Sequence, residues 1–350
     1  MYLNRNPTGS NGDTEDELQK VLDIKAKTNL TALEESLKTQ LKSIESQIDK
    51  EVNIRLANRI LISNKSPLLK TFETFVDNIF NTHIKSANFM KNYHFLRAES
   101  NEWIKSETNN IFKKLFDNEL SSNTSIALAN SVFLEAFWKN AFTQKYTTKD
   151  NFFDETQPDG ISVDTMKIWK QYKYIVNNSL DVMAIELPFR YESDISLVIL
   201  MPNNGHGLDE LTFKLDIHSL KVILNELDVS EEKKLVLSLP KFTIRSEYNL
   251  EDVFNGLGLK TLFDSTANLT DMTGDTTLHL SHGIHKAYIE IKEEGLQSSQ
   301  LSQLLYSPSV QFNNHPFVRH FPIKVNKPFI FIIRDYNTDI MLAMGQLRTL

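Results

Sequence analysis

A long polar segment between two strands near the C-terminus constrains the fold of this chain most. Residues 287–291 read A-Y-I-E-I, an alternation with period two that is typical of a half-buried strand. Residues 329–333 read F-I-F-I-I, a continuous apolar run typical of a strand buried on both faces. The segment that joins them is longer than an ordinary connection in a compact domain, and such segments are usually functional or disordered. The rest of the sequence must show what this segment is for.

Length and composition indicate a soluble globular protein. The chain has 350 residues, of which 41% are hydrophobic and 24% are charged. That is enough for one large domain or two ordinary ones with a sizeable core. The net charge is −7, and no long Lys/Arg block occurs, so we expect no nucleic-acid partner.

Several kinds of site are excluded by residue type or spacing. The absence of cysteine removes disulfides, thiol catalysis and cysteine-based metal sites. No apolar run approaches the length that spans a bilayer, so we expect no membrane partner. We find no His and carboxylate set at metal-ligand spacing and no nucleophile-base-acid motif, and we therefore expect no metal, no cofactor, no catalytic residue and no enzyme activity.

Helical patterns concentrate early in the chain and strand patterns late, which indicates an α+β fold. No internal repeat and no linker divides the sequence. The strongest predicted helices are 100–117, 216–227 with Asp216 as N-cap, and 250–257 ending at Gly258. The predicted strands include 54–63, 92–96, 125–138, 161–166, 169–176, 183–187, 196–201, 234–240 and 241–246.

Several segments, in order along the chain, resemble the serpin family. Residues 129–138, A-N-S-V-F-L-E-A-F-W, resemble the serpin central-sheet strand, and N-E-W-I at 101–104 and L-P-K-F at 239–242 resemble other serpin segments. Residues 284–295 are similar to the strand and hinge before the serpin reactive loop. V-N-K-P-F at 325–329, with Gly345, is similar to the C-terminal strands. The resemblance covers nearly the whole chain.

The resemblance implies a single domain over residues 1–350 with a central mixed β-sheet, two further sheets and about eight to nine helices. It also implies an exposed reactive-centre loop in the region 293–324. In that family a target serine protease cleaves the loop as a substrate. The cleaved loop then inserts into the central sheet as a new strand and carries the protease with it. An unpaired position in a sheet is a binding site for such a strand.

Glu293, Glu294 and Gly295 match the family's hinge, where a glycine allows the backbone to turn. Beyond it Leu296, Ser298 and Ser299 continue the hinge segment. The family usually has small residues here, so Ser298, Ser299 and Ser302 fit, whereas Leu296, Gln300 and Leu301 depart from the pattern. No charge occupies the alternate positions 296, 298, 300 and 302 that insertion would bury. Inhibition is therefore the favoured function, and the alternatives are a non-inhibitory carrier, chaperone or storage protein, or a truncated inactive serpin.

The position of the scissile bond depends on which family spacing is used. Counting about sixteen residues on from Glu293 gives Ser309–Val310. Counting back about nine residues from Asn326 gives Phe317–Val318, so the loop is about eight residues longer than usual. The insertion length is the more physical constraint, and we favour Ser309–Val310. With Tyr306 nearby, a chymotrypsin- or elastase-like target is favoured over a trypsin-like bond at Arg319–His320.

The resemblance assigns Asn130, Trp138 and His285 to the region that controls sheet opening. In serpins the residues that match Asn130 and His285 hydrogen-bond beneath the central sheet. The plainer interpretation of His285 is a core histidine whose ring is hydrogen-bonded. This interpretation nearly coincides with the role that the family resemblance implies.

Residues 1–3 align with the end of the family's second helix, so we expect an incomplete start that lacks the first helix, most of the second and any signal peptide. Sequons occur at five positions: Asn29, Asn64, Asn123, Asn177 and Asn268. We expect an extracellular, secreted glycoprotein that acts as a monomer.

Overall fold

The computed structural model describes residues 9–24, 32, 35–42, 52–80, 82–190, 193–203, 207–296 and 321–350. These residues fall into two compact units. The first unit contains the described residues up to 45, with 54–133 and 245–288. The second contains 52–53 and the described residues of 134–244 and 289–350.

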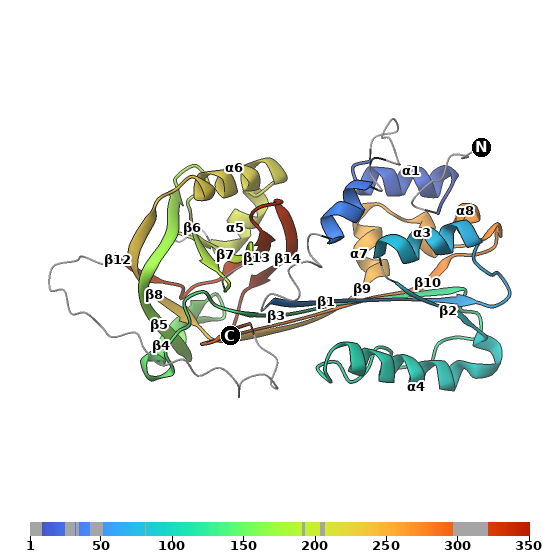
Figure 1. The fold of residues 1–350 in the computed structure, drawn as a ribbon, viewed down its shortest axis with the longest axis horizontal. Coiled ribbons are helices and arrows are strands. Elements are labelled where there is room, and N and C mark those ends of the chain that lie inside the picture. The colour runs from blue at the N-terminus through green and yellow to red at the C-terminus, as the bar shows by residue number, and fades with distance from the viewer. Residues whose placement is uncertain are drawn as a thin grey trace. The chain divides into compact units, whose positions relative to one another are not determined.

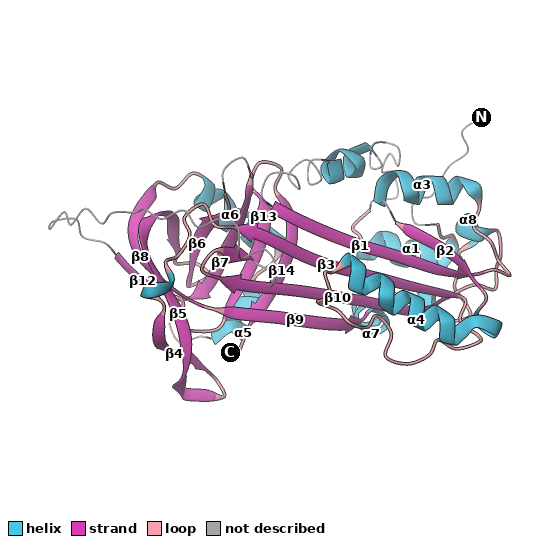
Figure 2. Ribbon diagram, turned by 60° about the horizontal axis from the view of Figure 1, so that its bottom comes forward, coloured by secondary structure: helices cyan, strands magenta, loops and turns pink. Residues whose placement is uncertain are grey.

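A six-stranded mixed sheet has the strand order β2-β1-β3-β11-β10-β9, and Figure 2 shows its long strands side by side. The pairs β1–β2 and β3–β10 are parallel, whereas β11 is antiparallel to both β3 and β10. The strands are β1 (Val52–Ser63), β2 (His83–Ala87), β3 (Ile126–Phe137), β9 (Phe242–Asn249), β10 (Leu280–Lys292) and β11 (Gly295–Leu296).

In the first unit, helices cover both faces of the sheet (Figure 1). On one face α4 (Phe89–Glu107) packs against Ala127 and Ala129 of β3. On the other face Ile126 and Leu128 of β3 pack against four further helices of this unit. Successive β3 side chains therefore point to opposite faces, as a strand requires. Those helices are α1 (Gly12–Val21), α3 (Lys70–Phe80), α7 (Leu250–Leu257) and α8 (Thr270–Thr273), with the 3-10 helix η2 (Thr261–Phe263) beside them.

The second unit contains an eight-stranded sheet with the order β12-β8-β5-β6-β7-β13-β14, and β4 pairs with β5. The family resemblance implies two further sheets, and here β5 joins them into one. Residues 165–173 of β5 pair with β8, and residues 174–177 of the same strand pair with β6. The strands are β4 (Thr148–Asp154), β5 (Gln157–Asn177), β6 (Val182–Pro188), β7 (Ile195–Pro202), β8 (Glu232–Pro240), β12 (Phe321–Lys324), β13 (Phe329–Asp335) and β14 (Ile340–Leu347). A 3-10 helix, η1 (Gln144–Tyr146), precedes β4.

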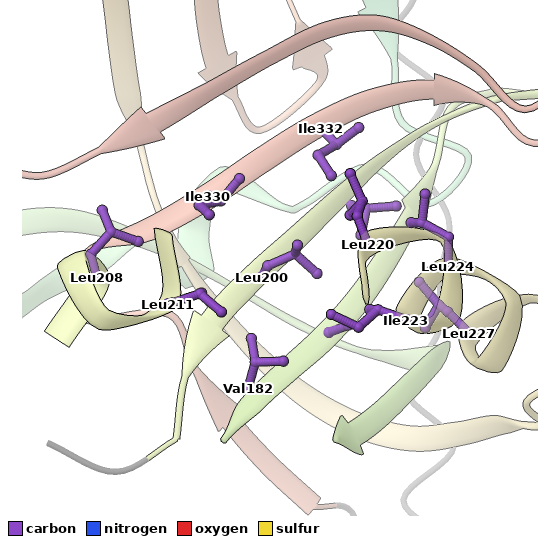
Figure 3. Packing of buried hydrophobic residues seen from close by; sticks show 12 residues of the cluster. Val182, Leu200, Leu208, Leu211, Leu220, Ile223, Leu224, Leu227, Ile330 and Ile332 are labelled. Atoms are coloured by element: carbon purple, nitrogen blue, oxygen red, sulfur yellow. The ribbon is translucent and has the colours of Figure 1, made fainter. Parts of the chain in front are cut away.

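The core of the second unit lies where two helices cover β6, β7 and β13 (Figure 3). The helices are α5 (Gly207–Lys214) and α6 (Ile217–Asp228). All seven residues of β13 are buried, as its continuous apolar run predicted. Asp216 caps α6 and accepts a hydrogen bond from the Ser219 backbone N–H, as predicted for this N-cap.

The sequence interpretation of residues 92–117 was wrong at both ends. The predicted strand 92–96 lies inside α4, whose buried Phe89, Leu96 and Ile104 recur at helical spacing. The predicted helix 100–117 ends at residue 107, and Asn109 and Asn110 take positive φ angles of 49° and 64°, which a helix does not allow.

Residues 111–116 have a helix-like apolar pattern but are irregular, and a side-chain contact holds them in place. Asn101 accepts hydrogen bonds from the backbone N–H groups of Leu115 and Phe116 at 2.7 and 3.0 Å. These bonds hold an irregular segment against α4, where Phe112, Leu115 and Phe116 are buried. Their apolar side chains produced a helix-like pattern without a helix.

A buried arginine joins three elements of the eight-stranded unit. The Arg334 side chain, 1% exposed, lies 2.8 Å from Glu186 and 2.5 Å from Asp228. Ser196 also donates a hydrogen bond to Glu186 at 2.7 Å. Removing one partner of a buried ion pair leaves an uncompensated charge, which is strongly unfavourable.

We therefore expect Arg334→Met to lower the free energy of unfolding by about 3–5 kcal/mol, because the buried Glu186 carboxylate would lose its positively charged partner. Chemical denaturation measures this difference. Arg348→Met is the matched control, since its partner Asp209 is 69% exposed, and exposed pairs contribute about 0–1 kcal/mol. Equal losses in the two variants would contradict the role given to Arg334.

Candidate functional site

Two neighbouring strands of the six-stranded sheet separate, and a third strand begins between them. β3 and β10 pair directly from Ile126 opposite Leu280 to Phe133 opposite Tyr288. Beyond these pairs β11 lies between them, with Gly295 opposite Phe137 of β3 and Lys292 of β10. The segment that the sequence singled out thus leaves β10 and at once pairs with both strands.

Gly295 makes the closest backbone approach in this site. Its φ is +141°, a region that favours glycine. A Cβ at this position would lie 2.1 Å from the Ala136 carbonyl oxygen and 2.7 Å from the Phe137 Cα. Any side chain at residue 295 would therefore push β11 away from β3.

Trp138 lies at the end of β3 and contacts the start of the segment. Its indole Nε1–H donates to the Lys292 carbonyl at 2.9 Å, and its backbone N–H donates to the Glu294 carbonyl at 2.8 Å. The indole is 2% exposed and stacks on Phe189 at 4.9 Å between ring centroids. A buried aromatic ring with its N–H satisfied fixes the place where β10 ends and β11 begins.

Glu293 is a buried carboxylate with two partners. Thr147 donates a hydrogen bond to it at 2.8 Å, and the Lys241 ammonium lies 3.0 Å away. Burial alone would raise the pKa of Glu293, but the bonds from Thr147 and Lys241 outweigh it and hold that pKa below its ordinary value. Glu293 is therefore ionised at neutral pH, and its contacts anchor the root of the segment.

Within the first unit, a chain of side-chain hydrogen bonds links β1, β3 and β10. His285 Nδ1 lies 2.5 Å from Asn130 Oδ1, and Asn130 Nδ2 donates to Asn58 Oδ1 at 2.6 Å. Tyr248 stacks on the imidazole at 6.2 Å between ring centroids. Burial lowers the pKa of His285, so it is neutral at physiological pH. The chain of bonds closes β3 on β10 without placing a charge there.

The other predicted site residues fall into three groups. Glu294 is exposed and Leu296 belongs to β11, whereas Ser298, Ser299, Ser309, Val310 and Asn29 lie outside the described residues. Asn64 and Asn123 are exposed, whereas Asn177 is half-buried and its amide donates a hydrogen bond to Glu226 at 3.1 Å. Asn268 is also half-buried, and its side chain accepts a hydrogen bond from the Thr270 hydroxyl at 2.8 Å.

Sequence reasoning missed Asn58, Thr147, Lys241 and Phe189 as members of this site. Lys241 stands in the L-P-K-F motif, which had been matched to the family but given no role. The others carry no local signal, because the fold brings them to the site from distant parts of the chain.

No described helix is both long and apolar enough to cross a membrane. Within the same described residues, no three His, Cys, Asp or Glu side chains gather as metal ligands.

Comparisons with known proteins agree on one family. A family model described as serpin (serine protease inhibitor) matches residues 2–349. Iripin-3 of Ixodes ricinus is 30% identical over 298 residues, which cover 85% of this chain and 73% of the relative. Antichymotrypsin-2 of Bombyx mori is 29% identical over 323 residues, which cover 88% of this chain and 82% of that protein. The structure of uncleaved ovalbumin superposes with a TM-score of 0.84 at 23% identity, covering 98% of this chain and 89% of that one, which shows the same fold.

We expect Gly295→Ala to release β11 from the sheet, because the added Cβ cannot fit beside the β3 backbone. Hydrogen–deuterium exchange of residues 294–296 should become faster. Gly256→Ala is the control, since a Cβ there meets nothing within 4 Å and lies in α7, so exchange at 294–296 should not change. Unchanged exchange in Gly295→Ala would show that the glycine is not needed for this pairing.

Proposed function

The chain belongs to the serpin family, and from this premise we propose that it inhibits a serine endopeptidase as a suicide substrate. The protease cleaves the segment that follows β11. The released part of the segment then inserts between β3 and β10, and the acyl-linked protease is carried with it. The observation that supports this proposal is β11 itself, a two-residue strand already paired with both neighbours.

The register of β11 defines how the rest of the strand would insert. Gly295 stands opposite Phe137, and Leu296 opposite Ala136. If it continued residue by residue, this register would bring Tyr306 beside Ile126, the first residue of β3. The segment up to Tyr306 would fill the whole length of β3, and cleavage at Ser309–Val310 leaves enough chain for it.

The same register gives Ser302 a specific role. If the β11 register continues, Ser302 would stand opposite Asn130 along β3 and opposite His285 along β10. Directly opposed residues in a sheet share a face, so Ser302 would enter between the two side chains that now bond to each other. Its hydroxyl can donate and accept, and can replace the Asn130–His285 bond with one bond to each.

A chymotrypsin- or elastase-like target is the finer part of the proposal. The favoured bond follows Ser309, and Tyr306 stands three residues before it. The name of the relative antichymotrypsin-2 points to the same class of protease. Secretion and glycosylation also belong to the proposal, with Asn64 and Asn123 as the exposed acceptors among the described sequons.

We expect incubation with chymotrypsin or elastase to give a complex that survives denaturing gel electrophoresis. N-terminal sequencing of the released C-terminal peptide should begin at Val310. Trypsin serves as the comparison, because cleavage after Arg319 would leave a much longer inserting segment. Cleavage by all three proteases without any stable complex would contradict inhibition and favour the carrier, chaperone or storage alternative.

A further inference from the structure

Residues 108–116, the irregular segment after α4, lie over the line where β3 meets β10. Phe112 stands in the middle of this segment and is 1% exposed. It belongs to the hydrophobic cluster that contains Ala129 of β3, and Tyr288 of β10 packs against the same cluster. A strand that enters the sheet would pass between β3 and β10, so the segment spans the place that has to open.

Both ends of the segment are hydrogen-bonded to α4. The Thr108 hydroxyl donates to the Ile104 carbonyl at 2.6 Å and accepts from the Phe112 backbone N–H at 3.2 Å. At the other end Asn101 accepts from the backbone N–H groups of residues 115 and 116. The backbone of the segment therefore follows α4.

Charged groups tie α4 to the strands on the β3 side. Glu99 of α4 lies 2.8 Å from the Arg59 guanidinium of β1 and also pairs with Lys85 of β2. Arg59 is 1% exposed, and its guanidinium lies 5.2 Å from the ring centre of Trp103 in α4. In the order of the sheet, β1 and β2 lie beyond β3, away from β10. The ends of the segment are thus fixed to the β1, β2 and β3 side.

The middle of the segment is bound on the other side, by β9 and β10. Arg245 of β9 donates to the Ile111 carbonyl at 2.8 Å, and its guanidinium lies 5.0 Å from the centre of the Phe112 ring. The Lys286 ammonium of β10 lies 5.8 Å from the same ring and 2.7 Å from Glu247. An aromatic ring attracts cations, and more strongly where water is excluded, as it is at Lys286, which is 3% exposed.

Entry of a strand would pull these two sets of contacts apart. Lys286 pairs directly with Ser131 of β3. If the β11 register continues, Leu301 would enter between these two residues. β3 and β10 would then lie about 10 Å apart instead of about 5 Å, because a new strand adds one strand spacing. The contacts of Phe112 with Arg245 and Lys286 would have to break while α4 stays with β1 and β2.

We propose that residues 108–116 form a strap that holds β3 and β10 together, and that Phe112 and Arg245 are positioning residues that set how fast a strand enters. This inference rests on the proposed function, because insertion is the step that the strap resists. In an inhibitor, insertion competes with hydrolysis of the acyl link to the protease. The strap would therefore set the fraction of encounters that end in a stable complex.

The test uses a fluorescein-labelled synthetic peptide with the sequence of residues 295–306, which supplies the entering strand without any protease. It is incubated with the full-length protein, and its incorporation is followed with time on native gels. Arg245→Met should speed incorporation about fivefold to thirtyfold, the loss of one hydrogen bond and one cation–π contact. Arg245 is exposed, so this variant should melt at the wild-type temperature. Arg245→Lys keeps a cation near the ring and should give an intermediate rate.

Arg97→Met is the matched control. Arg97 also donates to a backbone carbonyl, that of Asp117 at 3.0 Å, but it belongs to α4, so its bond does not reach β9 or β10. Its incorporation rate should equal that of the wild type.

Equal rates in the wild type and Arg245→Met would overturn the strap and leave insertion itself intact. An equal increase in Arg245→Met and Arg97→Met would also overturn it, because it would show general loosening of the fold. If the peptide entered neither the wild type nor Arg245→Met at any temperature below melting, both the strap and the proposed function would be contradicted.

Discussion

The pairing of β3 with β10 is the contact on which the rest of the account depends, because it must hold the sheet closed and still be replaceable. It is a single parallel ladder. A strand that continues β11 would be antiparallel to both neighbours and would replace this ladder with two. Parallel pairing is slightly less stable per residue than antiparallel pairing. The exchange would therefore gain hydrogen bonds and improve their geometry, which is a physical reason to expect the proposed insertion once the loop is cut.

Two groups of polar side chains set the limits of that exchange. Glu293, held by Thr147 and Lys241, fixes the start of the segment, so an inserting strand would enter at one place and in one register. Asn130 and His285 close the strands farther along, with neutral groups and hydrogen bonds. Neutral bonds can be broken and remade with a serine hydroxyl at much lower cost than a buried ion pair. The fixed contact is ionic and the replaceable contact is neutral.

Much of this fold could be predicted from sequence, and the reasons for the misses are physical. The apolar run of β13 and the caps Asp216 and Gly258 are local signals, and the structure confirms them. The segment 108–116 misled because its buried side chains are held by Asn101 and not by helical bonds. Asn130 and His285 were paired only through the family resemblance. Asn58 joins its site through long-range strand pairing, which no local pattern reveals, whereas Lys241 stands in a motif that was matched to the family without a role.

The central claim is that residues beyond Leu296 insert between β3 and β10, and the melting temperature of the loop-cleaved chain tests it most directly. The account predicts that cleavage at Ser309–Val310 raises the melting temperature, since two antiparallel ladders would replace one parallel ladder. It predicts a smaller rise for Ser302→Ala, which lacks the hydroxyl placed between Asn130 and His285, and an undiminished rise for the control Ser299→Ala. An unchanged or lower melting temperature after cleavage of the wild-type chain would contradict the account.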